Sequence, residues 1–445
     1  MHTAKFMHQI LDQSLHAFDE MALVIALPSI SSELGGELLY GVTLSSYVLA
    51  AMVATAWSGD WIDRHGPFGA FQIAITCFFV GLLMAIMADT IFKFIIARVL
   101  QGIGGGIVFT LAYAVTNRLC PIDLKSRMVA WLDSAWLLPS LLAPALGGFL
   151  VEHWSWRGLF WLQLPVLFAI VIMLLKPLKS LRLKPTSLDF SGLWTALLIG
   201  ICCALVVALT STPLNQSWLF LAPIIWLIWR PLGIVLPDEW WKLQTPLALS
   251  IILLGGLFFV FYGVESYTPL YLIEYRGMGV TETGLVFTCA AFTWVLASFL
   301  QSTLDRYFSH RHSLLSGALV FLVAFFMMAL VSVNSIPIGF IYSAWGLMGF
   351  AMGLTYNTLV TSAMLATQTG HEGATAGASG LMGSLCIGLA AGLGGAIKNQ
   401  VEYRSGDVGQ AMDLIGMLML AVLGVLILII WRRFPKEKIW YQSDK

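Results

Sequence analysis

The stretch Gly59-Asp60-Trp61-Ile62-Asp63-Arg64 decides the fold of this chain, because a weaker copy of it, Gln301-Ser302-Thr303-Leu304-Asp305-Arg306, follows 242 residues later. Both hexapeptides lie where an apolar segment meets a polar one. Two more pairs keep nearly the same displacement, at 241 and 244 residues: Pro28 with Pro269 and Gly102 with Gly346. Three matches in register predict that the chain consists of two similar halves.

The composition places these halves in lipid. Hydrophobic residues make up 58% of the 445 residues and charged residues 11%, and the mean hydropathy is +0.84. So little polar surface does not cover a water-soluble globule of this size. A membrane-spanning helix needs about 20 mostly apolar residues. Fourteen segments fit this requirement: 10–32, 41–62, 69–88, 91–117, 128–151, 158–176, 190–210, 217–236, 246–273, 281–303, 313–333, 336–362, 373–397 and 409–431.

The predicted architecture is an all-α integral membrane protein with 14 transmembrane helices, arranged as two six-helix pseudo-repeat bundles and an inserted helix pair. The first bundle covers residues 1–176, the cytoplasmic linker and the inserted pair cover 177–245, and the second bundle with a short cytoplasmic tail covers 246–445. The segment 217–236 is the weakest, because two prolines and an arginine interrupt it. Without the inserted pair, twelve helices remain and the others keep their orientation.

The distribution of lysine and arginine predicts the orientation. With the N-terminus inside, 18 of the 24 lysine and arginine residues lie on the cytoplasmic side, as the positive-inside rule requires. Both termini are then cytoplasmic. No small-residue cleavage site follows the first apolar segment, so we do not expect a cleaved signal peptide. The expected location is the cell membrane, crossed many times by a chain that works as a monomer.

The sequence contains no pattern typical of an enzyme or a metal site. The six cysteines lie in or beside apolar segments without metal-ligand spacing, which indicates free thiols. We find no His/Cys/Asp cluster, nucleophile motif or glycine-rich phosphate loop in a polar segment. The sequence predicts neither a metal nor a nucleic-acid partner.

The residues after the second apolar segment, Gly59-Asp60-Trp61-Ile62-Asp63-Arg64-His65-Gly66, resemble the loop signature of the major facilitator superfamily. Within it, the chain is most similar to the fourteen-helix drug:proton antiporters, although Pro67-Phe68 replaces the usual basic pair. The resemblance implies a charged latch at the cytoplasmic face, formed by Gly59, Asp60, Asp63, Arg64 and Gly66, with Asp305 and Arg306 in the second half. The alternative is that these charges are solvated helix ends.

The segment from Ile96 to Gly104, Ile-Ala-Arg-Val-Leu-Gln-Gly-Ile-Gly, resembles the helix-4 signature of the same family. The resemblance implies a role in proton transfer for its arginine, Arg98. A charge inside a membrane helix costs about 2.5–3.5 kcal/mol on insertion scales, so it usually faces protein or water. We therefore expect a buried carboxylate or carbonyl as its partner, unless Arg98 extends to the outer interface beside Lys93.

The segment Pro139–Gly148 resembles the helix-5 signature of antiporters, with alanine in place of glycine before Pro144. The residues that carry this match are Pro139, Ala143, Pro144, Gly147 and Gly148. A proline bend among small residues is expected to seal the outer side, or simply to pack a kinked helix. Trp154-Ser155-Trp156-Arg157-Gly158 and Asp189-Phe190-Ser191-Gly192 resemble turns of the fourteen-helix branch, which favours fourteen helices over twelve.

Helix 1 must carry acids into the membrane. Its uninterrupted apolar tract, Met21–Ile30, is about 15 Å long and does not cross a hydrocarbon core of about 30 Å. The helix therefore includes Asp19 and Glu20. Adjacent positions point about 100° apart, so one of the two faces the centre, and we expect it to be Asp19. Glu265 is the corresponding acid of the second half, unless it lies at the outer interface.

Many of the 17 tryptophans lie at segment ends, as in an aromatic belt. Trp136, Trp294 and Trp345 lie in mid-helix and, with Tyr262 and Asn357, are candidates for a substrate-cavity wall or for ordinary packing.

The sequence as a whole predicts a proton-coupled exporter of small lipophilic or cationic compounds in a bacterial plasma membrane, with the proton as coupling ion and no other cofactor. Its expected partners are a small-molecule substrate and the bilayer. The alternatives are a dedicated metabolite or siderophore exporter and a non-transporting membrane sensor on the same fold.

Overall fold

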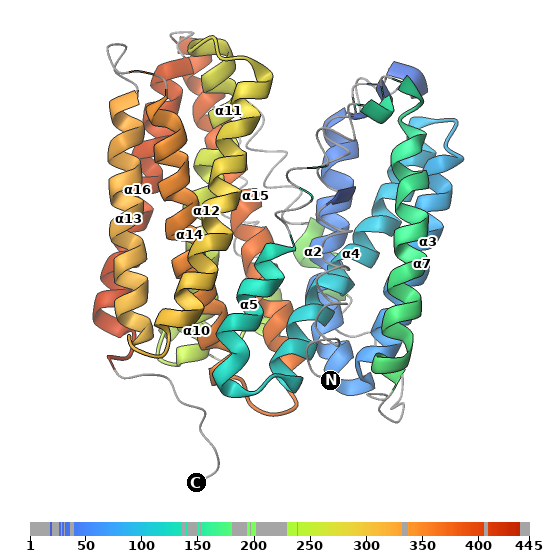
Figure 1. Ribbon diagram of the computed structural model, residues 1–445, viewed down its shortest axis with the longest axis horizontal. Helices are drawn as coiled ribbons and strands as arrows, with labels where there is room; N and C mark the ends of the chain where they lie inside the picture. The colour runs from blue at the N-terminus through green and yellow to red at the C-terminus, as the bar shows by residue number, and fades with distance from the viewer. Residues whose placement is uncertain are drawn as a thin grey trace. The chain divides into compact units, whose positions relative to one another are not determined.

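The computed structural model describes residues 18–19, 26–27, 29–30, 32–35, 40–135, 139, 142, 149–151, 153–179, 194–195, 197–201, 229–237, 239–331, 337, 339–404 and 408–436. Every regular element within these ranges is a helix (Figure 1). The α-helices are α2 Tyr40–His65, α3 Pro67–Ile86, α4 Ile91–Leu119, α5 Lys125–Ser134, α7 Arg157–Lys179, α10 Pro246–Glu265, α11 Thr268–Leu270, α12 Val280–Leu304, α13 His310–Val331, α14 Phe340–Ala366, α15 Glu372–Arg404 and α16 Val408–Arg433. Short 3₁₀ turns cover Ile122–Leu124 and Trp240–Lys242, and a π-helical turn covers Tyr271–Tyr275.

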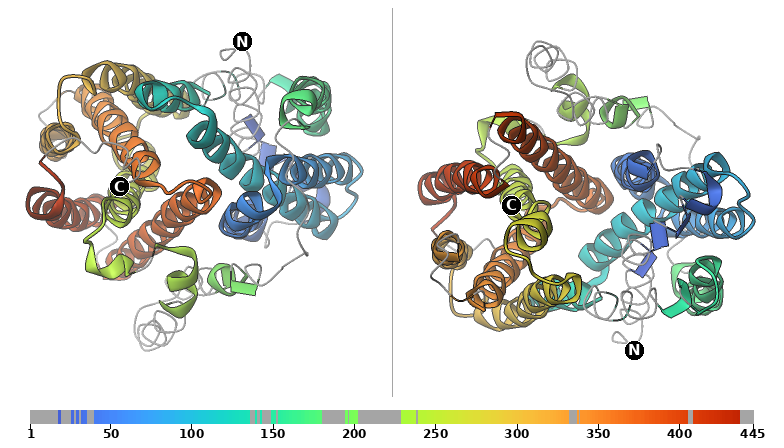
Figure 2. Two further views of the ribbon diagram at one scale, coloured as in Figure 1. Left: turned by 90° about the horizontal axis from the view of Figure 1, so that it is seen from below. Right: turned by 90° about the horizontal axis from the view of Figure 1, so that it is seen from above.

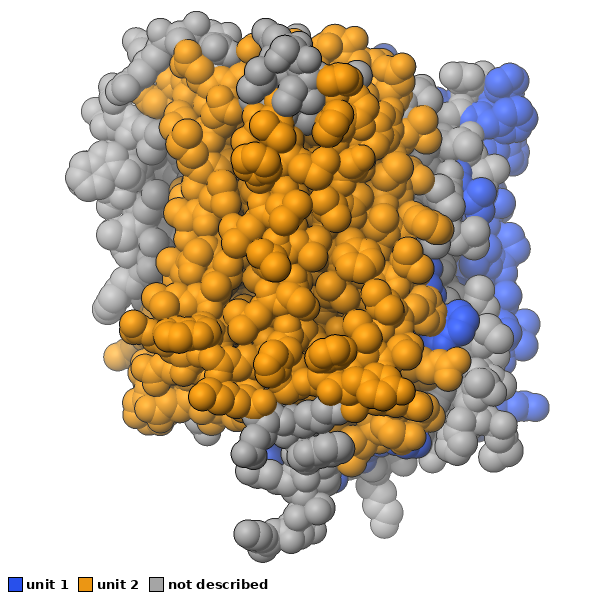
Figure 3. Space-filling model, turned by 60° about the vertical axis from the view of Figure 1, so that its left-hand side comes forward, with its two compact units in different colours: residues 1–121, 131–200, 368–381 blue, residues 122–130, 201–367, 382–445 orange. Residues whose placement is uncertain are grey.

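The chain forms two compact units. Unit 1 consists of residues 1–121, 131–200 and 368–381, and within it α4 packs against α2 and α3, while α3 also packs against α7 (Figures 1 and 2). Unit 2 consists of residues 122–130, 201–367 and 382–445. In unit 2, α14 packs against α10, α12 and α13, and α16 packs against α10 and α13 (Figure 2). Figure 3 shows one continuous face of unit 2.

Contacts between residues define these two units, so each consists of separate stretches of the chain. The first residues of α5 belong to unit 2, and the first residues of α15 belong to unit 1. The predicted division of the chain at residues 176 and 245 stays a prediction.

Eight of the described helices are long and apolar enough to cross a membrane: Pro67–Ile86, Ile91–Leu119, Arg157–Lys176, Pro246–Ile273, Glu282–Leu304, His310–Leu330, Glu372–Lys398 and Gly409–Arg433. Large apolar side chains are exposed on their outer faces, such as Ile172 on α7, which is 75% exposed. That distribution suits a lipid environment, and the chain is a multi-pass membrane protein. The predicted inserted pair lies mostly outside the described residues, and the total of fourteen helices stays a prediction.

Two long helices, α2 and α14, are not among these eight. Helix α14 is buried along most of its length, and its polar residues Thr355, Asn357 and Thr358 are fully buried. A helix enclosed by other helices makes little contact with lipid, so it can carry polar residues that a peripheral helix cannot.

Glycines spaced four residues apart bring one helix pair together in each unit. A Cβ added to Gly102 or Gly106 of α4 would overlap a carbonyl oxygen of α2. A Cβ added to Gly349 or Gly353 of α14 would likewise overlap a carbonyl oxygen of α12. Small residues at these positions are what allow two membrane helices to approach this closely.

Candidate functional site

A buried ion pair lies inside unit 1. Arg98 on α4 donates from Nη1 to Asp19 Oδ2 at 2.7 Å, and each residue is 1% exposed. The pair joins helix 1 to α4 across 79 residues of sequence. Asp19 thus supplies the buried carboxylate partner, and the Arg98 side chain does not extend to the outer interface. Either charge alone would be costly at this depth, because burial removes its hydration.

Two glutamines and a tyrosine complete this polar core. Arg98 Nη1 also donates to Gln101 Oε1 at 2.8 Å, and the Arg98 guanidinium lies 4.3 Å from the ring centre of Tyr47. Gln163 on α7 donates from Nε2 to Asp19 Oδ1 at 3.0 Å, and Gln101 Nε2 lies 3.5 Å from the same oxygen. Each carboxylate oxygen of Asp19 therefore faces at least one donor. The arrangement keeps the charges in place without access to water.

Several predicted residues lie outside the described residues: Glu20 of helix 1, Trp136, and Ala143, Pro144, Gly147 and Gly148 of the predicted antiporter segment. Pro139 is a buried residue in helical conformation. Glu265 is the last residue of α10 and is partly exposed. The roles predicted for these residues stay predictions.

The Trp154–Gly158 motif forms a cluster at the start of α7. Arg157 donates from Nη1 to Glu33 Oε1 at 2.6 Å and from Nη2 to the Ala88 carbonyl at 2.8 Å, and Trp156 Nε1 donates to Glu33 Oε2 at 2.7 Å. The hydrogen bond from Arg157 lowers the pKa of Glu33 below its usual value. Carbonyl groups at the end of a helix have no donor within that helix, and Arg157 supplies one to the Ala88 carbonyl just beyond the end of α3.

The hexapeptide Gly59–Arg64 lies at the end of α2, against the start of α15. The Asp63 carboxylate accepts hydrogen bonds from the backbone amides of Gly373, at 2.8 Å, and Ala374, at 2.7 Å. These are among the first amides of α15, which have no acceptor within their own helix. Asp63 therefore acts as an N-cap supplied by another helix, and its charge complements the positive end of the helix dipole.

Gly59, one turn before Asp63, makes this contact sterically possible. A Cβ on Gly59 would overlap the Gly373 carbonyl oxygen, and a Cβ on Gly373 would overlap the Gly59 carbonyl oxygen. The two backbones meet at this point because both residues lack a side chain. Gly66 ends the motif with φ 84°, which a residue with a side chain rarely adopts, and Pro67 then begins α3.

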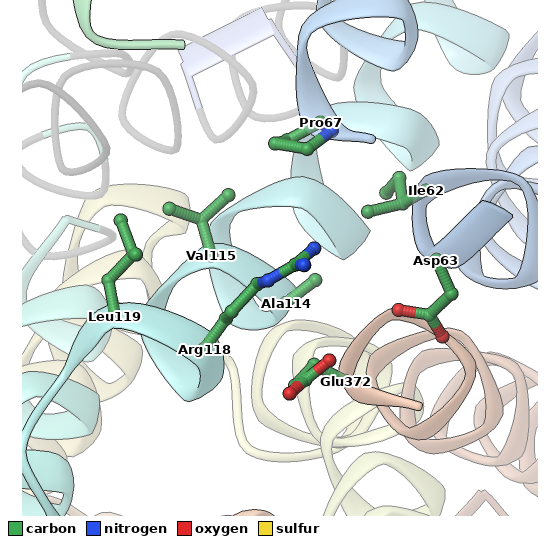
Figure 4. A pocket seen from close by; sticks show the side chains of 8 residues that line it. All are labelled: Ile62, Asp63, Pro67, Ala114, Val115, Arg118, Leu119 and Glu372. Carbon is green, nitrogen blue, oxygen red and sulfur yellow. The ribbon is translucent and has the colours of Figure 1, made fainter. Parts of the chain in front are cut away.

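Charged side chains surround this contact. Asp63 lines a pocket with Ile62, Arg118 and Glu372 (Figure 4). Asp63 follows the predicted span 41–62, and burial raises its pKa to about 6, although the two backbone amides lower it. Asp60 and Arg64 form an exposed ion pair at 2.8 Å one helical turn apart.

The second copy of the hexapeptide makes different contacts. Asp305 is the C-cap of α12 and lies 3.0 Å from His310 Nε2, at the start of α13. Gln301, which takes the place of Gly59, is buried and donates to Ser313 Oγ at 3.0 Å. Arg306 is exposed. These contacts join α12 to the next helix of the same unit.

The start of α5 binds to α14 within unit 2. Ser126 Oγ donates to Asn357 Oδ1 at 2.6 Å, and Asn357 Nδ2 donates to the Ser126 carbonyl at 2.9 Å. Lys125 Nζ donates to the Met364 carbonyl at 3.2 Å, near the end of α14. Asn357, a predicted cavity residue, thus connects two helices, and a cation again meets the negative end of a helix.

The other predicted cavity residues belong to an aromatic cluster of unit 2. Trp345 is fully buried, with ring centres 4.9 Å from Phe287 and 5.7 Å from Phe261. Tyr262 and Trp294 are partly exposed, and both lie beside Phe261. The burial of Trp345 fits packing, whereas Tyr262 and Trp294 present ring surface outside the core. Their role in substrate binding stays a prediction.

Sequence reasoning missed four of these polar residues: Gln101, Gln163, Lys125 and Ser126. Gln101 lies in the quoted helix-4 signature, and Gln163 is the only amide or charged residue between Arg157 and Lys176. Such an isolated polar residue in an apolar segment is a usable signal. Lys125 and Ser126 carry no such signal because they lie in a polar connection.

Apolar helices of membrane length, a buried ion pair in unit 1 and a helix cap at the end of α2 are features of a polytopic membrane transport protein. Residues 13–392 match the family model of the Major Facilitator Superfamily, and the chain belongs to this family. The expected membership is confirmed.

Named relatives of this chain include efflux proteins. An uncharacterized MFS-type transporter of Mycobacterium tuberculosis is 26% identical over 60% of this chain, and the match spans 41% of that relative's length. A probable multidrug-efflux transporter of the same species is 24% identical, covering 93% of this chain and 91% of the relative. The multidrug efflux pump SdrM of Staphylococcus aureus is 22% identical, with 96% of each chain covered.

Solved structures share the fold. A human organic anion transporter superposes with a TM-score of 0.70 at 15% identity, covering 95% of this chain and 99% of its own. The proton:xylose symporter XylE superposes with a TM-score of 0.68 at 15% identity, covering 99% of this chain and 97% of its own. Transporters of unlike substrates share this architecture, so it identifies the fold and not the cargo.

Proposed function

We propose that this protein is a proton-coupled efflux antiporter of fourteen helices, which exports small lipophilic or cationic compounds across a bacterial plasma membrane with both termini in the cytoplasm. The names of the full-length relatives support drug export. The Asp19–Arg98 ion pair is the observation that carries the proposal of proton coupling. The proton is the only coupling agent that the proposal requires, and the protein acts as a monomer.

The ion pair suits an exchanger because three cations compete for one carboxylate. Arg98 occupies Asp19 in the closed pair; a proton neutralises Asp19, and a cationic substrate replaces Arg98. When Asp19 is neutral, Arg98 keeps Gln101 and the Tyr47 ring as partners. A cation over a desolvated ring gains about 2 kcal/mol, which limits the cost of leaving the guanidinium without its carboxylate.

The contact between Asp63 and α15 supplies the conformational part of this proposal. An exporter of this family alternates access by moving its helical bundles, and a helix cap from another helix is a contact that such a movement can break and re-form. The substrate would meet the aromatic surface of Tyr262 and Trp294, which suits lipophilic cations because aromatic faces attract them. Glu265 is the second candidate for proton binding.

A substrate-dependent proton flux in reconstituted vesicles tests the proposal. Ethidium gradients should drive proton movement through the wild-type protein, whereas Asp19→Asn should insert and fold without coupling. Asp89→Asn is the matched control, because Asp89 forms an exposed pair with Lys93 outside this core. Retained coupling in Asp19→Asn, with loss in Glu20→Gln or Glu265→Gln, would place the coupling acid elsewhere.

Arg98→Lys tests the other half of the pair. A buried guanidinium that binds two oxygens is not replaced by an ammonium, so export should fall while the amount of folded protein stays the same. Wild-type export by Arg98→Lys would show that a simple positive charge is sufficient.

A further inference from the structure

Gln163 is a polar residue on an apolar helix. It is 2% exposed and lies in the second turn of α7, among residues that are otherwise apolar. A buried amide is costly unless its groups are hydrogen-bonded. Its Nε2 has a partner, the Oδ1 oxygen of Asp19 at 3.0 Å. Its Oε1 has no hydrogen-bond partner among the described residues.

The two glutamines around Asp19 differ in their freedom to turn. Gln101 Oε1 accepts a hydrogen bond from Arg98 at 2.8 Å, so a turn of this amide would place its NH₂ group against the guanidinium. The Gln163 amide meets no such obstacle, because its oxygen is bound to nothing in the described part of the chain. The last torsion of a glutamine side chain is broad and has two nearly equivalent settings.

Protonation of Asp19 changes the hydrogen-bonding group that a neighbour must provide, from a donor to an acceptor. A carboxylate only accepts hydrogen bonds, whereas a protonated carboxyl group donates one. Arg98 Nη1 occupies Oδ2 with a donor, so the proton goes to Oδ1, the oxygen that faces Gln163. In the present setting the Gln163 NH₂ group would then face an O–H donor. A half-turn of the amide puts Oε1 there instead.

We propose that Gln163 is a positioning residue that serves Asp19 in both protonation states, donating from Nε2 to the carboxylate and, after a half-turn, accepting at Oε1 from the carboxylic acid. The proposal rests on the proposed function, in which Asp19 takes up a proton. The turn needs no backbone movement and leaves one amide atom without a partner in either state. Gln101 serves only the charged state, because Arg98 fixes it.

The other groups around Asp19 do not replace Gln163. Among the described residues, the titratable and charged groups of this core are Arg98 on α4 and Tyr47 on α2, and Tyr47 contacts Arg98 through its ring face. The Arg98 guanidinium cannot accept the Asp19 proton from Oδ1, because it only donates. Of the two glutamines on that side, Gln163 is the one whose amide oxygen is not already bound to a described residue.

Infrared difference spectroscopy of the purified, full-length protein tests this proposal without transport. The C=O stretch of protonated Asp19 is identified by its loss in Asp19→Asn. In Gln163→Met this band should move to higher frequency, since the carboxylic O–H loses its acceptor, whereas in the control Gln301→Met, which removes a buried glutamine bound to Ser313 in unit 2, it should keep its wild-type frequency. An unchanged band in Gln163→Met overturns the proposal, and so does the absence of an Asp19 band at every pH at which the protein is folded.

A second measurement uses the wild-type protein and avoids any folding defect of the variant. With isotope-labelled glutamine side chains, protonation of Asp19 should shift one amide C=O band to lower frequency, and Asp19→Asn should abolish the shift. In export assays, Gln163→Met should lower the maximal rate about tenfold, the effect of one unsatisfied buried donor, and change the pH profile. Absence of proton-coupled export in the wild type would refute the proposed function, but the infrared bands would still decide the role of Gln163.

Discussion

The hexapeptide at the end of α2 and its copy at the end of α12 occupy corresponding places in the sequence, yet they make different contacts. Asp63 binds two backbone amides of α15, 310 and 311 residues away, whereas Asp305 binds His310 in the next helix. Gly59 lets α15 touch the backbone of α2. At the equivalent position Gln301 fills the space with a side chain bound to Ser313.

This difference shows that the glycine, more than the aspartate, determines what the motif does. An aspartate at a helix end accepts whichever donors come within reach. Without a side chain at position 59, a second helix start comes within hydrogen-bond distance, and the aspartate caps it. With a glutamine at the same position, the aspartate remains in its own helical hairpin.

The largest effect is expected for Gly59→Leu. The added side chain meets the backbone of Gly373 rather than a flexible side chain, so α2 and α15 must separate and the cap on α15 is lost. We expect a loss of about 3 kcal/mol in unfolding free energy, at the upper end for overpacking, and loss of ethidium export. Thermal unfolding and efflux assays measure both.

Gly424→Leu on α16 is the control for this substitution, because no atom from another described part of the chain lies within 4 Å of a Cβ at that position. It should unfold and export like the wild type. Export by Gly59→Leu at the wild-type rate would refute the need for this close approach.

The next largest effect is expected for Asp63→Ala compared with Asp305→Ala. Removal of an N-cap costs about 1–2 kcal/mol, and two amides lose their acceptor. Hydrogen exchange at Gly373 and Ala374 should accelerate about fivefold, since about 1 kcal/mol of protection is lost. Asp305→Ala should leave these two amides unchanged; equal acceleration in both variants would mean that the effect is not local.

The pH dependence of stability should reveal the titration of Asp63. Burial raises the pKa of Asp63 from 3.8 to about 6. Between these values the folded protein holds a proton that the unfolded chain releases, so stability falls as pH rises through this window and is level above it. We expect a fall of about 1 kcal/mol, less than the full shift implies, because part of the group is exposed.

Melting temperatures of the wild type and Asp63→Asn, measured across this pH range, test the sign. The Asp63→Asn protein should lack this fall, since its amide does not titrate. A rise in wild-type stability over the same window that disappears in Asp63→Asn would contradict the assignment to Asp63.

The smallest effect is expected for Arg64→Gln. Its ion pair with Asp60 is exposed, and such pairs contribute about 0–1 kcal/mol. Stability should change by less than about 0.5 kcal/mol, as it should for Arg306→Gln in the copy. If export falls in Arg64→Gln at unchanged stability, Arg64 acts in the transport cycle rather than in the fold.

The sequence predicted the positions of the strongly apolar helices α3 and α4 well, because length and hydropathy determine them. The expected segments 69–88 and 91–117 correspond to Pro67–Ile86 and Ile91–Leu119. It also predicted a buried partner for Arg98, since an unpaired charge at that depth is costly.

The sequence could not identify the partners themselves. Asp19 is 79 residues from Arg98, and which side of α7 carries Gln163 toward it depends on how the helices pack. The same holds for Trp345, whose mid-helix position suits a cavity wall as well as the core in which it lies. The sequence also could not predict that Asp63 binds amides of α15, because every residue except proline has a backbone amide and a sequence pattern does not distinguish them.

The capping of α15 by Asp63 also sets an order on synthesis. The ribosome makes Asp63 310 residues before Gly373, and unit 1 is complete only when residue 381 of 445 has been added. Until then α2 stands in the membrane without the amides that its carboxylate will bind, and water must hydrate that charge. A nonsense mutation shortly before Glu372 therefore deletes α15 and α16, and it also destabilises α2, because Asp63 loses the amides that it binds.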